Sequence, residues 1–407
     1  MKPKKFTPAH NSKELAELVC SNSLKSTSPD KASGILKKEM LQLDSLIINS
    51  AYSCQLPAGG ALAVDRQKFS KEVSRKIKNN PLIQVIEEEV LSIEEGTTTP
   101  TIIATGPLTS SNLSTNIEEF IGKENLSFYD SISPIVSYES LDNDHCFRAS
   151  RYEENEGDYI NCTLNQSEYA LFHRTLIESE KIEFHKFEKP NYFEGCLPIE
   201  VMAERGFETL RFGPMKPVGL TDPKTGKRPF AVVQLRKENS NESMWNLVGF
   251  QTKMKIKDQK EALSCIPALK KAEFLRFGSI HRNTYINSPG VILNTLQSQK
   301  DPLIFFAGQI TGVEGYSESA AMGLIAGINS SRVFKNLEPI VFPIKSALGC
   351  LTKYISDSTN KKIQPMNINL GLFDIKKPKK NIEKIKKSSR ECINEINMRN
   401  QIELDLV

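Results

Sequence analysis

Residues 305–332 read FFAGQITGVEGYSESAAMGLIAGINSSR, a pattern that predicts a β-strand running through a glycine-rich turn into a helix. The strand is expected in the apolar run at residues 303–306, and Gly308, Gly312 and Gly315 mark the turn. Such a turn directs free backbone N–H groups and the positive end of a helix dipole at one point, which suits a phosphate or another anion. By spacing alone, this stretch is more often an ordinary strand–turn–helix unit without a ligand.

The composition is typical of a folded protein with no strong overall charge. The 407 residues are 39% hydrophobic and 25% charged, with a net charge of +4, so two or three domains are expected and nucleic-acid binding would need a local basic patch. The eight cysteines show no CxxC spacing, so we expect no zinc ribbon, thioredoxin motif or other metal site. No signal peptide or membrane span is predicted, which favours a cytoplasmic protein with reduced thiols.

The order of the expected elements indicates an α/β protein with a different region in its middle. The first part is expected to hold helices at residues 12–19, 35–51 and 69–78, then strands at residues 82–90, 91–95 and 101–106. Residues 109–195 are more polar. The later elements are expected to be an antiparallel hairpin at residues 226–236 and 244–253, a helix at 260–274, a strand at 277–286, a helix at 344–355 and an amphipathic tail helix after a lysine run at 376–387.

Ten motifs occur in one order along nearly the whole chain. They are TPAH (7–10), ELVCSNS (17–23), PAGGALAVDR (57–66), IATGPLTS (103–110), EGCLPIEVMAERG (194–206), LRFGPMKPVGL (210–220), WNLVGFQTKM (245–254), GSIHRNTYINSP (278–289), AGQITGVEGYSES (307–319) and QPMNINLGL (364–372). Together they resemble the motifs of TrmFO, the folate- and flavin-dependent uracil-5-methyltransferase family that is related to the tRNA-modifying GidA proteins. No single motif would be specific enough.

The resemblance implies a glutathione-reductase-like, Rossmann-type FAD-binding domain that is interrupted by an inserted α+β domain. The implied division is residues 1–108 and 276–407 for the FAD domain, with a basic helical tail, and residues 109–275 for the inserted substrate domain. Family members carry a GxGxxG turn for the FAD pyrophosphate, and because this sequence has no such turn, we expect the first βαβ unit to be missing from it.

The resemblance further implies a reaction. Members take a one-carbon unit from methylenetetrahydrofolate, reduce it through FAD with NAD(P)H as reductant, and form 5-methyluridine, usually in the T-loop of tRNA. A related branch methylates 23S rRNA, and this alternative stays open. So does an inactive TrmFO-like paralogue that lacks the FAD pyrophosphate site.

Two cysteines match functional positions of the family. C5 of uracil is a poor nucleophile until a group adds to C6, and a thiolate suits that addition, after which a base must remove the C5 proton. By resemblance, Cys196 is the C6 nucleophile, and Cys20 is the base or a partner of the flavin or the nucleophile. Cys20 is expected at the C-terminal end of the helix at residues 12–19, a place that does not favour a thiolate.

Other positions match the family's binding sites. The implied flavin contacts are Gly59, Gly60, Asp65, Arg66, Gly308, Gln309, Gly312, Gly315 and Tyr316. Asp65 is equally expected to cap the helix at residues 69–78. The candidate contacts to RNA or folate are Arg211, Lys216, His281 and Arg282, with a structural role for His281 as the alternative. The lysine run at residues 376–387 is a candidate RNA-facing patch, although such runs are more often solvated surfaces.

Overall fold

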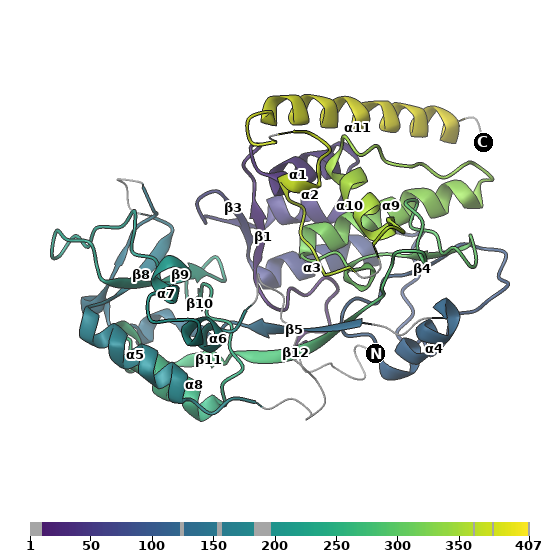
Figure 1. Cartoon of the computed structure of the whole chain (residues 1–407). Coiled ribbons are helices and arrows are strands. Elements are labelled where there is room, and N and C mark those ends of the chain that lie inside the picture. Colours follow the sequence, from purple (N-terminus) through teal and green to yellow (C-terminus); the bar gives the residue numbers. More distant parts are fainter. Residues whose placement is uncertain are drawn as a thin grey trace.

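The computed structural model describes residues 10–122, 126–152, 157–182, 197–360, 363–376 and 378–405. Figure 1 shows two bodies side by side, one built from both ends of the chain and the other from its middle. Strands β5 (Leu126–Ile132) and β12 (Ser279–Tyr285) pair antiparallel and run between them. The chain therefore leaves the first body and returns to it along one two-stranded ribbon.

The first body is mixed α/β. Its strands β1 (Ser23–Ser26), β3 (Ala61–Val64) and β2 (Gln55–Leu56) form one antiparallel sheet, while β4 (Thr101–Ile103) and β13 (Ile304–Phe306) pair in parallel. Its helices are α1 (Ala32–Gln42), α2 (Leu46–Ser53), α3 (Arg66–Lys78), α4 (Ser111–Ile121), α9 (Tyr316–Phe334), α10 (Ala347–Ser356) and α11 (Ile382–Asp405). The strand–turn–helix unit predicted at residues 305–332 is confirmed as β13 and α9.

The second body is built on one antiparallel sheet. Its strand order is β11-β6-β10-β9-β8-β7, from β6 (Ile135–Ser137), β7 (Cys146–Arg148), β8 (Tyr159–Leu164), β9 (Ala231–Lys237), β10 (Met244–Leu247) and β11 (Phe274–Arg276). It also contains helices α5 (Gln166–Glu178), α6 (Ile199–Glu204), α7 (Thr209–Phe212) and α8 (Ile256–Ser264). The predicted hairpin is confirmed, because β9 and β10 pair with Trp245 opposite Lys237.

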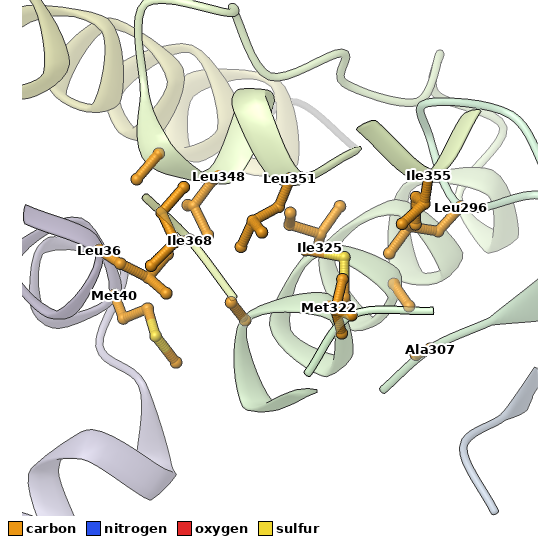
Figure 2. Packing of buried hydrophobic residues seen from close by; sticks show 14 of the residues in the cluster. Leu36, Met40, Leu296, Ala307, Met322, Ile325, Leu348, Leu351, Ile355 and Ile368 are labelled. Carbon is orange, nitrogen blue, oxygen red and sulfur yellow. The ribbon is translucent and has the colours of Figure 1, made fainter. Parts of the chain in front are cut away.

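Each body has its own hydrophobic core. In the first core, Figure 2 shows Met322 and Ile325 of α9 among Leu296, Leu351 and Ile355, all of them buried. Burying a side chain of this size contributes roughly 1.5–3 kcal/mol. Helix α4 also belongs to this core, since the Phe120 ring lies 6.2 Å from that of Phe306. We therefore propose that the inserted domain begins after α4 and not at residue 109.

Of two helices predicted near the N-terminus, one is absent and the other is divided in two. Residues 12–19 form turns, because the Glu17 carboxylate accepts the N–H groups of Asn11 and Ser12 and so competes with a helix. The helix predicted at residues 35–51 is divided between α1 and α2. Asp44 has a positive φ of 52°, and Ser45 then caps α2 by accepting the N–H of Ile48.

The strands predicted at residues 82–95 were also wrong. This segment forms turns, bends and irregular backbone with no strand, and Leu82 is 92% exposed. An apolar run forms a strand only where a neighbouring strand takes its hydrogen bonds. The helix predicted at 260–274 begins earlier, as α8, and a 3-10 turn with Pro267 at its start follows it. No helix of the described residues is both long and apolar enough to cross a membrane.

A buried carboxylate joins three helices of the first core. Glu39 of α1 is fully buried and accepts hydrogen bonds from Ala347 N at 2.6 Å, Leu348 N at 2.9 Å and Ser389 Oγ at 2.6 Å. Burial raises the pKa of Glu39 to about 7, although these three hydrogen bonds act in the opposite direction.

This raised pKa leads to an expected pH dependence of stability. A carboxyl group whose pKa is higher in the folded chain stabilises it fully below pH ~4.5, and the contribution is lost as the pH rises through about 7. We expect this loss to be on the order of 3 kcal/mol, and Glu39→Gln should lack it. Urea unfolding between pH 4.5 and 8 measures both proteins, with exposed Glu119→Gln as the control. Equal pH dependence of the Glu39→Gln variant and the wild type would contradict the assignment.

Candidate functional site

A cavity of about 1010 Å³ opens at the carboxyl ends of the parallel strands β4 and β13. Most of its lining comes from three segments that are distant in sequence, namely residues 16–25, 104–110 and 308–323, and residues 88–90 add to it. Ligands of α/β proteins bind at this end of parallel strands, because the chain turns there expose backbone groups and helix N-termini.

One wall of the cavity consists of the glycine turn and the start of α9. Gly308 and Gly315 line it with φ angles of +80° and +108°, values that favour glycine. A Cβ on Gly315 would lie 2.5 Å from an oxygen of Glu318, so a side chain here would have to displace that carboxylate. Along the helix, a Cβ on Gly323 would meet no atom within 4 Å. This wall is therefore open to a flat group and presents the positive end of a 19-residue helix.

The Cys20 thiol lies at the cavity beside a half-buried tyrosine. The hydroxyl oxygen of Tyr316 is 3.1 Å from Cys20 Sγ and accepts the backbone N–H groups of Val19 and Cys20, each at 2.8 Å. Because both lone pairs of the phenol are used, its proton is left to donate to the sulfur. Burial raises the pKa of Tyr316 well above its usual range, and negative charge on Cys20 raises it further, so the phenol stays protonated.

Arginines hold the chain on both sides of Cys20, through backbone carbonyls before it and side chains after it. Arg66 Nη1 donates to Leu18 O at 2.7 Å and to Val19 O at 2.9 Å. Two arginines that sequence reasoning missed complete the set. Arg276 donates to Val19 O at 3.0 Å, and Arg236 donates to Ser21 Oγ and Asn22 Oδ1, each at 2.9 Å. Guanidinium groups near a thiol favour its thiolate form.

The missed Arg236 has a partial signal in the sequence. Along β9, Val233 and Leu235 face the second core, so strand alternation places Gln234 and Arg236 on the other face. The pattern identifies a polar face of the strand. It does not reveal that this face meets residues 21–22, more than 200 positions earlier in the chain.

Four predicted flavin positions lie together at the cavity, namely Gly308, Gln309, Gly315 and Tyr316. Gly312 lies behind it, where a Cβ would come within 2.5 Å of Ile363 Cδ1. Arg66 acts on the Cys20 loop, as described above.

The remaining predicted flavin positions lie at the junction of the two bodies. Gly59 and Gly60 are exposed, and Gly59 N donates to Asp158 at 2.7 Å. Asp65 caps α3, because its Oδ1 accepts Gln67 N and Lys68 N, each at 3.1 Å. The sequence allowed Asp65 either a flavin contact or a helix cap, and the structure shows the helix cap.

Two other candidate residues, Arg211 and Lys216, are not among the described residues that line this cavity. Arg211 stacks 3.7 Å above the Phe230 ring and pairs with Glu208 in the second body, and Lys216 lies half-buried four residues after α7. Cys196 lies outside the described residues. His281 and Arg282 are part of β12, and their side chains also lie outside the described part of the structure.

Comparisons with known proteins decide the family. A sequence model of the family described as "Glucose inhibited division protein A" matches residues 5–338. The "Methylenetetrahydrofolate--tRNA-(uracil-5-)-methyltransferase TrmFO" of Bacillus licheniformis is 53% identical over 373 residues, which cover 92% of this chain and 85% of that protein. The proteins of the same name from Enterococcus faecalis and Bacillus subtilis are 52% identical over the same shares. This chain belongs to the TrmFO family.

The fold agrees with this membership. Two crystal forms of Aquifex aeolicus GidA superpose with TM-scores of 0.67 at 15% identity, covering 96% and 93% of this chain and 70% of each GidA chain. The TrmFO resemblance and the GidA-like α/β fold predicted from the motifs are therefore confirmed.

FAD is the cofactor that TrmFO membership implies, and one side of the cavity fits it. The glycine turn and the small residues Ser319, Ala320 and Gly323 of α9 leave room for a flat ring system, and the cavity is large enough for a dinucleotide. The lining also includes Glu88 and Glu89, whose carboxylates do not suit a pyrophosphate. The fit is therefore to the ring and ribityl part of the cofactor.

The Tyr316 hydroxyl yields a test of this geometry. Replacing Tyr316 with Phe leaves the N–H groups of Val19 and Cys20 without their acceptor, so we expect a loss of roughly 2–4 kcal/mol in unfolding free energy. Urea unfolding measures the loss. Tyr354→Phe is the matched control, since that hydroxyl makes one bond, to Gln364 O, and should lose about 1 kcal/mol. Equal losses of unfolding free energy in the two variants would contradict the assignment of the Tyr316 hydroxyl as acceptor for both N–H groups.

Proposed function

We propose that this chain forms 5-methyluridine in tRNA by transferring a one-carbon unit from methylenetetrahydrofolate. The observation that carries this proposal is the 53% identity, over 92% of the chain, to a protein named for that reaction. We further propose NAD(P)H as the source of electrons and the cytoplasm as the location. The cavity beside Cys20 supports the proposal, because it combines a thiol, a proton donor and a helix N-terminus at one place.

The α9 wall is the proposed flavin site. Backbone groups of Gly308 and Gly315 and the first turn of α9 would hold the cofactor, with Gln309 and Tyr316 beside it. When bound, the flavin supplies the two electrons that reduce the one-carbon unit from the methylene to the methyl level. The protein's own part is to bring uracil and folate to this wall and to exclude water from it.

The chemistry at the uracil is assigned to the two cysteines. The Cys196 thiolate forms a bond to C6, which moves an electron pair toward C5 and makes C5 nucleophilic. C5 then bonds to the methylene carbon of the folate, its proton passes to the Cys20 thiolate, and the bond from that carbon to the folate nitrogen breaks with its electron pair left on the nitrogen. With the two electrons that a bound flavin would supply as hydride, the carbon would become the methyl group as the S–C6 bond breaks, which restores the ring and the Cys196 thiolate. The Tyr316 hydroxyl and the arginines around residues 18–22 support Cys20 in this role, because they stabilise negative charge on its sulfur.

The cysteines provide the direct test. We expect Cys196→Ser and Cys20→Ser each to lower methylation by about 100-fold or more, since serine replaces a nucleophile or a base poorly. The assay follows 5-methyluridine by nucleoside mass spectrometry, with an unmodified tRNA transcript and a 23S rRNA fragment as separate substrates. Cys54→Ser is the control, because Cys54 is a half-buried thiol outside the cavity.

The outcomes separate the possible readings. If 5-methyluridine formed only in the rRNA fragment, the substrate would be 23S rRNA, as in the rRNA-methylating branch of the family. Wild-type protein that binds no flavin and forms no product from either RNA would contradict the enzyme proposal. Full activity of Cys20→Ser would overturn the assignment of Cys20 as the base.

A further inference from the structure

We propose that Glu238, which follows β9 in the second body, is a positioning residue for the Cys20 thiol and acts through Arg66. The inference extends the proposed role of Cys20, and it assigns the second body a part in shaping the thiol site of the first. Its basis is a chain of buried contacts that crosses the junction of the two bodies.

The first step links Cys20 to Arg66. The Arg66 guanidinium binds the carbonyl groups of Leu18 and Val19 through one nitrogen, Nη1. These two carbonyls directly precede Cys20 in the chain. The direction of the Cys20 side chain toward Tyr316 therefore depends on where this guanidinium is held.

The second step links Arg66 to Glu238. Arg66 Nε and Nη2 donate to the two carboxylate oxygens of Glu238 at 2.5 and 3.1 Å, in the two-pronged geometry that only arginine provides. The Glu238 side chain is 1% exposed. With all three of its contacting nitrogens engaged, the guanidinium is fixed between the carboxylate on one side and the Cys20 loop on the other.

A second anchor from the same strand holds the other side of Cys20. Arg236 binds Ser21 and Asn22, and Asn22 Nδ2 donates in turn to Lys237 O at 2.7 Å. Three consecutive residues at the end of β9 thus hold the chain before and after the thiol. Since β9 lies inside the six-stranded sheet, a displacement of that sheet moves the Cys20 loop directly.

The position of the thiol is measured by its alkylation. Iodoacetamide at fixed pH is followed by mass spectrometry of the Cys20 peptide, in wild type and in Glu238→Gln and Arg66→Lys. We expect alkylation to be several-fold faster in both variants. Glu238→Gln frees the loop and leaves the Arg66 charge unbalanced beside the thiol, and Arg66→Lys keeps the charge but loses the fork. Glu242→Gln is the matched control, because its ion pairs with Arg148 and Lys237 lie within the second body.

The rate of methylation distinguishes a displaced Cys20 thiol from a general loss of folding or ligand binding. We expect Glu238→Gln and Arg66→Lys to lower the single-turnover methylation rate roughly tenfold or more, with RNA affinity and the flavin spectrum unchanged. Because Glu238 acts through Arg66, the double variant should be no slower than Arg66→Lys alone. Should Glu238→Gln fail to fold, Arg66→Lys carries the alkylation test by itself.

Unchanged Cys20 alkylation in the folded variants, or additive losses in the double variant, would overturn the inference. Alkylation needs neither RNA nor folate. Its result is therefore independent of whether the proposed methylation occurs, and a failure of this inference can be told apart from a failure of the proposed function.

Discussion

The backbone of residues 18–22 lies between two hydrophobic cores, where its polar groups must find partners inside the protein. Those partners come from distant elements, since the N–H groups of Val19 and Cys20 bind Tyr316 while the neighbouring carbonyls bind Arg66 and Arg276. A buried N–H or C=O without a partner costs roughly 1–3 kcal/mol. The positions of α3, α9 and β9 therefore supply hydrogen-bond partners for residues 18–22. The orientation of the Cys20 thiol follows from these hydrogen bonds.

The same contacts give the cavity an uneven electrostatic character. Around Cys20, the guanidinium groups of Arg66, Arg236 and Arg276 face one buried carboxylate, Glu238, and the N-terminus of α9 adds its dipole. The cavity lining also includes Glu88 and Glu89. Negative charge that develops during a reaction is therefore favoured near the thiol and disfavoured near Glu88 and Glu89.

The sequence was informative wherever local rules decide structure. The β13–turn–α9 unit and the hairpin of β9 and β10 were found because a glycine turn and strand alternation are local patterns. Residues 82–95 show where such patterns fail, since an apolar run cannot supply a pairing strand. At residues 12–19, the Glu17 carboxylate binds nearby backbone N–H groups and replaces the expected helix with turns. That correction also removes Cys20 from a helix C-terminus, so the dipole objection to its thiolate no longer applies.

By itself, the sequence determined the family and the α/β fold, because ordered motifs and apolar periodicity are properties of the chain alone. It also determined that glycines at positions 308 and 315 would open a turn before a long helix. Only the tertiary structure decided which residues surround Cys20. The hydroxyl of Tyr316 is 296 positions away from Cys20, and Glu238 is 172 positions away from Arg66. Such contacts form when two cores pack against one segment, and no local pattern of the sequence records them.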